Sequence, residues 1–343
     1  QPVEALFAGD DRHGPDALST AEAGFVGGLA GASLEPDEMP EAVRVECPDW
    51  AEADLRASLG DGFGDEMAAL LGEAPVDIRV ARRKAEREPI IASLEKGGLT
   101  ATPTPHSPDG LRLEGRASLA GHRLYRDGVI EIQDEGSQLV ALMCDVSPGM
   151  QVVDFCAGAC GKALALADLM GGVGRIVACD VDERRLARGK ARIGRSGLDN
   201  IEPRVLRDEA DRWVARQKGK FDRVLVDAPC SGVGAWRRNP WARWRPPDLA
   251  ALNNLQDRIM ASAARLVKPG GRLIYVTCSL LASENQGRID VFRNNHPDFR
   301  PIRPIGVDHL GGKDSQGETM LLTPLRHGTD GFFIAVMQRD DGA

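Results

Sequence analysis

Two cysteines each follow a strand-like apolar run, one in the stretch VDAPCSG (226–232) and one in TCS (277–279). Cys230 comes three residues after Asp227, so a thiol and a carboxylate share one turn, and Cys278 occupies the second turn. Burial as a small hydrophobe is the common fate of a free cysteine, but it fits two thiols in turns past strand ends poorly. It remains our interpretation for Cys47, Cys144 and Cys179.

These residue types suit the methylation of an unreactive pyrimidine carbon. Carbon 5 of cytosine is too weak a nucleophile to take a methyl group from a sulfonium unaided. A thiolate that adds to carbon 6 turns the ring into an enamine whose carbon 5 can attack. Asp227 would form a hydrogen bond at the ring nitrogen and amino edge as the adduct develops. Because the enzyme–base bond must break afterwards, a second thiol nearby also has a use.

The turn CAGACGKA (156–163) follows the strand-like run QVVDF (151–155) and admits three nucleotide-binding interpretations. A P-loop needs four residues between its first glycine and Gly-Lys, followed by Ser or Thr, and this turn meets neither condition. A dinucleotide fingerprint needs glycine where Cys156 stands. The interpretation that we favour is a turn for S-adenosylmethionine, in which small residues let backbone amides approach the methionine part.

Acids at the ends of the following strands support the same cofactor. Asp180 ends the second strand, where it would hold the ribose hydroxyls. Asp208 ends the third strand and could receive the adenine amino group. Asp182 is expected to cap the next helix, which would leave Asp180 free. Four predicted strands carry such an acid, namely Asp154, Asp180, Asp208 and Asp227.

The pattern of strands and helices predicts where these turns lie. From about residue 130, apolar strands of four to six residues alternate with amphipathic helices, which indicates a doubly wound, Rossmann-like α/β sheet. The runs TMLLTP (319–324) and GFFIAVMQR (331–339) predict an antiparallel hairpin at its end. In this fold the strand ending at Asp227 lies beside the one ending at Thr277, so both thiols should meet in one cleft. Upstream, residues 76–115 predict a β-α-β-β module of the kind that often carries RNA.

The charge distribution favours a nucleic-acid partner in spite of a net charge of −8. Residues 1–75 hold 17 acidic and 3 basic side chains, so the rest of the chain holds 40 basic against 34 acidic. In the segment 236–245, three Trp alternate with four Arg, and such planes and cations suit unstacked bases and phosphates. A basic cluster at 184–195 is interpreted as a solvated helix face. Expected RNA contacts are Arg79, Arg82, Arg83, Trp236, Arg237, Arg238, Trp244 and Arg245.

Other classes of protein fit the composition less well. The apolar runs are shorter than the roughly 20 residues that a membrane helix needs, and no secretory leader is apparent. The 7 cysteines form no Cys-x-x-Cys pair, and none of the 6 histidines has a thiol at ligand spacing, so we predict no metal. The sequence predicts a cytoplasmic monomer with free thiols.

The motifs quoted above, with VACDVDERRLARGKAR (177–192), the segment 255–286 and HGTDGFFIAV (327–336), resemble the RsmB/Sun (Fmu) branch of RNA cytosine-5 methyltransferases. The resemblance extends from PDW (48–50) almost to the C-terminus, and paired DAPCSG and TCS motifs are highly specific. It implies a class I fold that uses S-adenosylmethionine and acts on RNA, with 16S ribosomal RNA the expected substrate.

The resemblance also implies roles for single residues. Cys278 would be the nucleophile and Cys230 would assist product release, whereas DNA cytosine methyltransferases use the cysteine of the Pro-Cys motif as the nucleophile. Lys162 would lie near the target base and Asp227 at its edge. Implied cofactor contacts are Cys156, Ala157, Gly158, Ala159, Cys160, Gly161, Lys162, Asp180, Asp208 and Asp227.

The chain departs from the family pattern at three points. Cys160 and Ala163 replace Gly and Thr of the usual Gly-Gly-Lys-Thr turn, and at a position with positive φ the added side chain would weaken cofactor binding. Ala81 replaces the Asn of the usual Arg-Val-Asn. Most of the helical N-terminal domain of the ribosomal-RNA members has no counterpart. We expect an acidic helical or mobile extension at 1–47, an RNA-binding module (RRM-like or ferredoxin-like) at 48–129 and a catalytic domain at 130–343.

Two alternatives to a methyltransferase acting on RNA have different sequence correlates. A binding or assembly factor would keep the fold and the RNA contacts but lose catalysis through the changes in the turn. A methyltransferase for small molecules would leave both thiols and the Trp/Arg segment unexplained.

Overall fold

The computed structural model describes residues 7, 16–29, 31–33, 35–115, 118–306, 310 and 317–342. The chain forms two compact units, Gln1–Glu46 and Cys47–Ala343. In the first unit, Ser19 and Glu22 form a capping box at the start of α1 (Thr20–Gly28), as the helical pattern predicts, and α2 (Glu41–Arg44) follows. Residues 1–6 and 8–15 of the predicted N-terminal extension lie outside the described residues. No helix in the described ranges combines the length and apolarity needed to cross a bilayer.

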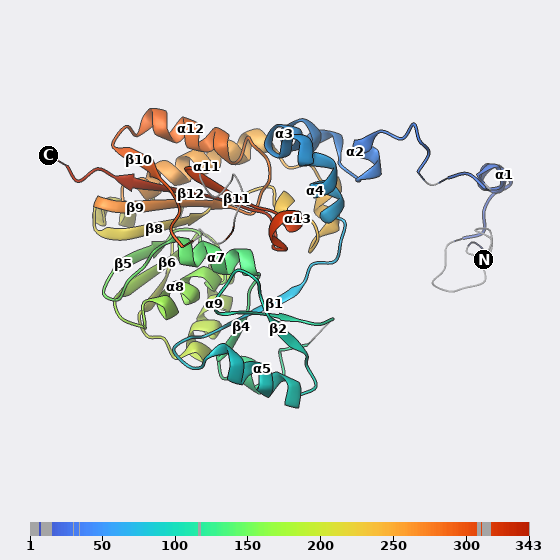
Figure 1. Cartoon of the computed structure of the whole chain (residues 1–343). Coiled ribbons are helices and arrows are strands. Elements are labelled where there is room, and N and C mark those ends of the chain that lie inside the picture. The colour runs from blue at the N-terminus through green and yellow to red at the C-terminus, as the bar shows by residue number, and fades with distance from the viewer. Residues whose placement is uncertain are drawn as a thin grey trace. The chain divides into compact units, whose positions relative to one another are not determined.

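The second unit is built around a large mixed sheet with the strand order β10-β12-β9-β8-β5-β6-β7 (Figure 1). Strands β5 to β9 are parallel, and β12 pairs antiparallel with β9, β10 and β11. The predicted doubly wound class and the hairpin of β11 and β12 are confirmed. The strands are β5 (Gln151–Asp154), β6 (Arg175–Asp180), β7 (Ile201–Val205), β8 (Phe221–Asp227), β9 (Val267–Thr277), β10 (Phe299–Ile302), β11 (Thr319–Leu322) and β12 (Phe332–Arg339).

Helices cover both faces of this sheet because successive strand residues point to opposite sides. Val152 packs into the core on the side of α7, α8 and α9, whereas its neighbour Val153 packs into the core beside α10, α11 and α12. Both valines are completely buried, so β5 carries no exposed face. The helices are α7 (Glu135–Met143), α8 (Gly161–Leu169), α9 (Glu183–Ser196), α10 (Arg212–Arg216), α11 (Leu249–Ala264) and α12 (Gln286–Asn295).

The upstream module is a four-stranded antiparallel sheet with the order β2-β3-β1-β4. Its elements are β1 (Val76–Val80), α5 (Arg87–Lys96), β2 (Ala101–Pro103), β3 (Gly110–Leu113), α6 (Arg123–Arg126) and β4 (Ile130–Ile132). The order of elements is therefore βαββαβ, which is the ferredoxin-like arrangement. Its core contains Ile78, Leu94, Leu111 and Ile130, all at most 4% exposed.

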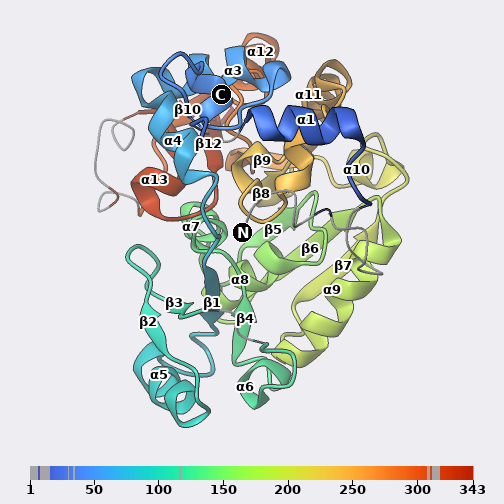
Figure 2. The same ribbon diagram turned by 90° about the vertical axis from the view of Figure 1, so that its right-hand side faces the viewer.

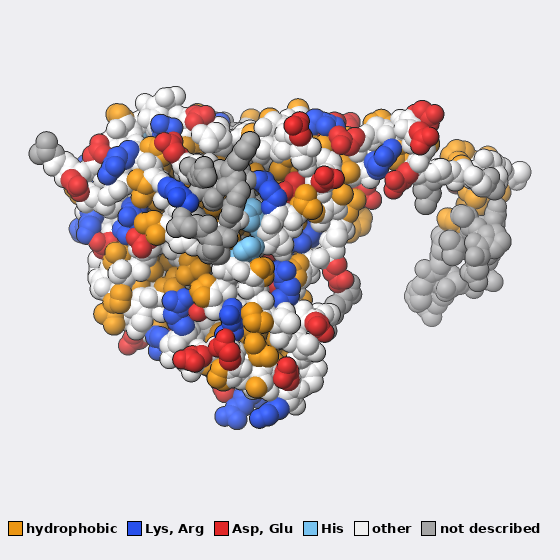
Figure 3. Space-filling view, viewed as in Figure 1, with side chains coloured by type: hydrophobic (Ala, Val, Ile, Leu, Met, Phe, Trp, Pro, Cys, Tyr) orange, Lys and Arg blue, Asp and Glu red, His pale blue; other side chains and the backbone are white. Residues whose placement is uncertain are grey.

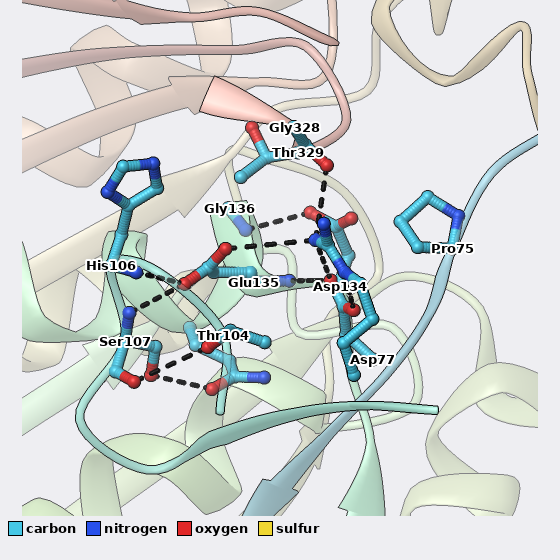
Figure 4. Close-up of polar contacts among 12 residues, drawn as sticks. Pro75, Asp77, Thr104, His106, Ser107, Asp134, Glu135, Gly136, Gly328 and Thr329 are labelled. Carbon is cyan, nitrogen blue, oxygen red and sulfur yellow. Dashed lines mark hydrogen bonds and ion pairs between the residues drawn. The ribbon is translucent and has the colours of Figure 1, made fainter. Parts of the chain in front are cut away.

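The module lies beside α7 and α8 of the large sheet (Figures 1 and 2), and buried polar contacts join the two. The Arg79 guanidinium on β1 lies 3.1 Å from the Asp168 carboxylate on α8. The Glu135 carboxylate accepts hydrogen bonds from the backbone N–H groups of His106 and Ser107 at 2.6 and 2.7 Å (Figure 4). These contacts tie β1 and the loop between β2 and β3 to α8 and α7 of the large sheet.

Two further helices, α3 (Asp49–Leu59) and α4 (Phe63–Ala69), pack near the carboxyl ends of the strands. The Asp54 carboxylate accepts a hydrogen bond from the Ser283 backbone at 3.1 Å, just after the TCS turn. Glu66 accepts one from the Thr323 hydroxyl at 2.6 Å, at the start of α13 (Pro324–His327).

Acidic and basic side chains alternate over the face of the molecule shown in Figure 3 rather than forming a field of one sign.

Candidate active site

A cleft of about 720 Å³ opens at the carboxyl ends of β5, β6, β8 and β9. This is where open α/β sheets bind ligands, because the loops after adjacent strands diverge there. Most of the residues that the sequence singled out meet in it, including both thiols. Predicted site residues that line the cleft are Cys156, Ala157, Gly158, Ala159, Gly161, Lys162, Asp180, Asp208, Asp227, Cys230 and Cys278.

Asp180, the acid that ends β6, fixes the glycine turn through a hydrogen bond. Gly158 has φ +52, and its N–H donates to Asp180 Oδ2 at 2.7 Å. Asp180 Oδ1 accepts from the Asp182 N–H at 2.8 Å, and Asp182 caps α9 as predicted. The sequence suggested that Asp180 is free for another role. Its carboxylate is instead only 4% exposed and ties the turn to the sheet. A Cβ at Gly158 would meet only the Arg185 guanidinium, at 3.6 Å, which leaves the backbone accessible from the cleft.

The acids of the cleft complement a cationic cofactor. Asp208 accepts hydrogen bonds from the Arg207 guanidinium and the Ala210 N–H, both at 2.9 Å. Glu209 and Asp227 add two carboxylates to the same wall, which suits the positive charge of a sulfonium. The accessible backbone of the turn, the start of α8 and these acids therefore fit S-adenosylmethionine.

Cys160 does not face the cleft, which corrects its assignment as a cofactor contact. It precedes α8 with φ +60, is completely buried, and its N–H is taken by the Ala157 carbonyl at 2.7 Å. Its side chain points at α9, where a Cβ on Gly189 would lie 2.5 Å from the Cys160 sulfur. The extra atoms relative to glycine are thus accommodated by Gly189 instead of by the cofactor space.

This pairing predicts non-additive stability changes. We expect Gly189→Ala to lower the free energy of unfolding by roughly 1–3 kcal/mol through overpacking against Cys160. In a Cys160→Gly background the same change should cost at least about 1 kcal/mol less, since residues in contact couple. Urea unfolding of the two single variants and the double variant measures this difference. Additive effects would show that the two side chains do not compete for one space.

Lys162 and Asp227 form an ion pair in the cleft. Lys162 Nζ lies 2.7 Å from Asp227 Oδ2. Burial, the largest influence, lowers the pKa of Lys162, but the charge and hydrogen bond of Asp227 outweigh it, so the pKa is raised above its usual value. The ammonium is therefore charged at neutral pH and fixed in the cleft, where it interacts with Cys278.

Asp154, at the end of β5, is a buried acid with an unusual protonation equilibrium. Burial, followed by the charge of Asp227, raises its pKa from 3.8 to about 7, against the opposing effect of Lys162. Because the folded pKa lies above the unfolded one, stability falls as the pH rises through the window between these values and then levels off.

We expect Asp154→Asn to remove this dependence. The free energy of unfolding of this variant should be close to that of the wild type at pH 4 and exceed it by about 2–4 kcal/mol above pH 7. Chemical unfolding at several pH values tests this, and parallel profiles for the two proteins would contradict it.

The two thiols lie at adjacent strand ends, as the parallel pairing of β8 and β9 requires. Cys230 Sγ is 3.4 Å from Cys278 Sγ, and both side chains are partly exposed to the cleft. The hydrogen bond with the Cys278 sulfur, then burial, raise the pKa of Cys230 well above its usual value. One sulfur is thus held as a thiol beside the other.

Comparison with known proteins agrees with this geometry. The family described as 16S rRNA methyltransferase RsmB/F matches residues 141–338, and the ferredoxin-like domain of RsmF/B-like methyltransferases matches residues 47–120. The first match alone spans more than half of the chain. This chain belongs to the RsmB/F methyltransferase family. The resemblance inferred from the motifs is confirmed, and the family is one of enzymes that use S-adenosylmethionine as the cofactor.

Several members of the RsmB/F family are similar over most of this chain. The probable ribosomal RNA small subunit methyltransferase B of Synechocystis sp. is 32% identical over 315 residues, which are 89% of this chain and 70% of that protein. Its counterpart in Bacillus subtilis is 31% identical over 87% of this chain and 67% of that protein. In Xanthomonas campestris, the ribosomal RNA small subunit methyltransferase B is 33% identical over 84% of this chain and 66% of that protein.

Solved structures share the whole architecture. The crystal structure of PH0851 superposes with a TM-score of 0.80 at 32% identity, over 90% of this chain and 70% of that one. A methyltransferase homolog protein from Pyrococcus horikoshii gives 0.72 at 26% identity, over 89% of this chain and all of that one. The module and the catalytic sheet thus occur together in other proteins.

Burial corrects part of the predicted RNA surface in this RsmB/F member. Trp236 is 1% exposed and packs edge-on against Trp50, with ring centroids 5.9 Å apart. Arg79 is 5% exposed and paired with Asp168, and the Arg237 side chain, 7% exposed, is paired with Asp330. These three side chains hold elements together and have little surface left for RNA.

The remaining members of that set stay predictions. Arg238 is partly exposed but bridges the Asp134 and Asp330 carboxylates. Trp244 is 57% exposed, and the neighbouring Trp241, which the pattern contained but the list of contacts did not, is 72% exposed. Other predicted contacts with exposed side chains are Arg82, Arg83 and Arg245.

Sequence reasoning missed one wall of the cleft, contributed by the junction of β4 and α7. Ile132 is 47% exposed there, and Gln133 donates to the Ser137 hydroxyl at 3.2 Å and to the Gly161 carbonyl at 3.4 Å. The Arg79 guanidinium donates to Gln133 Oε1 at 2.9 Å, so the wall links the module to the glycine turn. No motif marked these residues, because their function depends on the docking of two domains.

Proposed function

We propose that this chain transfers a methyl group from S-adenosylmethionine to carbon 5 of a cytosine in RNA, through a transient bond between Cys278 and carbon 6. The observation that carries the proposal is the pair of sulfurs 3.4 Å apart in a cleft that also holds the Lys162–Asp227 ion pair. A methyltransferase acting on a more nucleophilic atom needs neither sulfur.

Each residue of the cleft has a distinct task in this reaction. The turn at 157–161, Asp180 and Asp208 would hold the cofactor, which supplies an electrophilic methyl group when bound. Asp227 would accept a hydrogen bond from the exocyclic amino group of cytosine. The Lys162 ammonium, close to both Asp227 and Cys278, would stabilise negative charge that develops on the ring.

The bonds change in a fixed order. The Cys278 thiolate would form a bond to carbon 6, and the electron pair displaced to carbon 5 would take the methyl group, whose bond to the cofactor sulfur breaks and leaves a neutral thioether. The proton on carbon 5 then leaves to water in the cleft, carbon 5 and carbon 6 regain their double bond, and the Cys278 sulfur departs as a thiolate. Cys230, 3.4 Å away, would donate a hydrogen bond to this departing sulfur.

Small-subunit ribosomal RNA is the substrate that we propose, because the curated relatives are named for it and share the module and the catalytic sheet with this chain. The ferredoxin-like module and the exposed rings of Trp241 and Trp244 would offer RNA a surface on which unstacked bases can stack.

The test combines purified protein, tritiated S-adenosylmethionine and small-subunit RNA, either naked or within the particle. Bisulfite sequencing of the product should report one 5-methylcytosine above background. Label at another base, or at another position of cytosine, would overturn the proposal. Calorimetry with S-adenosylmethionine separates an enzyme from an assembly factor that has lost catalysis. The side chain of Cys160, which points at Gly189 and not into the cleft, supports the enzyme.

A further inference from the structure

The completely buried carboxylate of Glu284 forms hydrogen bonds with the turn that carries Cys230. Glu284 Oε1 accepts hydrogen bonds from the Ser231 N–H at 2.9 Å and from Gln256 Nε2 at 3.0 Å, and Glu284 Oε2 accepts one from the Ser231 hydroxyl. Glu284 lies two residues before α12 and makes no ion pair in the part of the chain that the structure describes. The Glu284 carboxylate is therefore stabilised by neutral hydrogen-bond donors. Two of these donors belong to Ser231, in the turn that carries Cys230.

The next residue, Asn285, holds the other thiol turn in the same way. Asn285 Oδ1 accepts a hydrogen bond from the Thr277 hydroxyl at 2.6 Å, and its Nδ2 donates to the Ser279 carbonyl at 2.9 Å. The hydroxyls of Ser231 and Ser279, which directly follow the two cysteines, lie 3.2 Å apart. Two consecutive buried residues thus fix two separate turns, and a hydrogen bond between the serines joins these turns.

Resting on the function proposed above, we propose that Glu284 is a positioning residue that fixes the Cys230 turn against the Cys278 turn and keeps Cys230 as a neutral thiol. Cys230 then serves as a hydrogen-bond donor to the Cys278 sulfur and does not compete with it as a nucleophile. Asn285 fixes the Cys278 turn without adding charge.

The charged groups around the two sulfurs agree with this division. The influences that raise the pKa of Cys230 are, in order, the hydrogen bond with Cys278, burial, the charge of Cys278 and the charge of Glu284. Tyr275, whose hydroxyl donates to the Glu284 carbonyl at 2.7 Å, is neutral because burial raises its own pKa. Lys162, a cation that lines the same cleft, interacts with Cys278. Farther from the sulfurs, Arg288 and Asp257 neutralise each other at 2.7 Å.

Thiol labelling tests this without RNA. In wild-type protein, iodoacetamide at pH 8 followed by peptide mass spectrometry should modify Cys278 at least about tenfold faster than Cys230. In Glu284→Gln, the labelling rate of Cys230 at pH 8 should rise roughly three- to tenfold, because loss of the charge lowers its pKa by up to about one unit and each unit changes the thiolate fraction tenfold.

Ser231→Ala is the matched control. It removes the hydrogen bonds of the Ser231 hydroxyl to Glu284 and to Ser279 but keeps the charge of Glu284, so the pH dependence of Cys230 labelling should stay close to that of the wild type. An unchanged Cys230 profile in Glu284→Gln would overturn the proposal, and so would an equal shift in Ser231→Ala.

A second measurement covers the case in which Glu284→Gln does not fold. The order of labelling in the wild type then decides, since faster modification of Cys230 than of Cys278 at pH 8 contradicts a neutral Cys230. Because labelling needs no RNA, failure of methyl transfer in the RNA assay leaves these outcomes intact and counts only against the proposed function.

Discussion

We expect that replacing Cys278 by alanine abolishes methyl transfer to RNA, while the fold and cofactor binding survive. In the proposed mechanism Cys278 supplies the bond to carbon 6 without which carbon 5 cannot attack, so the rate should fall by more than about 10³-fold. The side chain is partly exposed at the edge of the cleft, and its truncation leaves no large cavity in the core. Transfer of tritium from labelled S-adenosylmethionine to RNA measures the effect.

Cys47→Ala serves as the control for the loss of a thiol. Cys47 is buried before α3 and does not line the cleft, so this variant should keep its activity. Calorimetry should give the same affinity for S-adenosylmethionine in Cys278→Ala as in the wild type. Residual activity within tenfold of the wild type would exclude Cys278 as the nucleophile.

For Cys230→Ala we expect the opposite result, namely that a covalent complex between the protein and RNA accumulates. Without a hydrogen-bond donor 3.4 Å from the Cys278 sulfur, departure of that sulfur from carbon 6 is slowed more than its addition. We expect at most one turnover and a protein–RNA complex that survives denaturing electrophoresis, which the wild type should form at least about tenfold less.

The double variant Cys230→Ala/Cys278→Ala identifies the atom that carries the RNA. The complex should disappear in this variant, and treatment with nuclease followed by peptide mapping should place the nucleotide on Cys278 in the single variant. Loss of activity in Cys230→Ala without any complex would void the assigned roles, and a complex in the double variant would exclude Cys278.

Much of the fold was predictable because its determinants are local. Short apolar runs separated by amphipathic helices predicted β5 to β9, and Asp180, Asp208 and Asp227 marked the strand ends that face the cleft. The adjacency of the two thiols followed from parallel pairing of β8 with β9, which sequence order alone makes reasonable in such a sheet.

What escaped prediction depends on partners far away in the sequence. Arg79 and Arg237 looked like RNA contacts because their acids, Asp168 and Asp330, lie about 90 residues further on. The side chain of Cys160 points at Gly189, which could not be foreseen from a turn motif. The strands β4 and β10 were also missed.

Glu284 illustrates the same limit within the active site. Its segment was part of the resemblance, yet a lone acid before a helix predicts only a surface group or a cap. Only the meeting of β8, β9, α11 and α12 encloses it beneath Ser231, with Gln256 as a further partner. Buried polar residues of this kind become visible when the elements that satisfy them are assembled.

The covalent step is tested most directly by incubating wild-type protein and S-adenosylmethionine with small-subunit RNA transcripts that contain 5-fluorocytosine. Fluorine cannot leave carbon 5 as a cation, so the methylated adduct cannot resolve and the enzyme–base bond persists. We expect mass spectrometry to find a methylated fluorocytidine attached to the peptide that contains Cys278. Attachment at Cys230, or methyl transfer without any adduct, would contradict nucleophilic attack by Cys278.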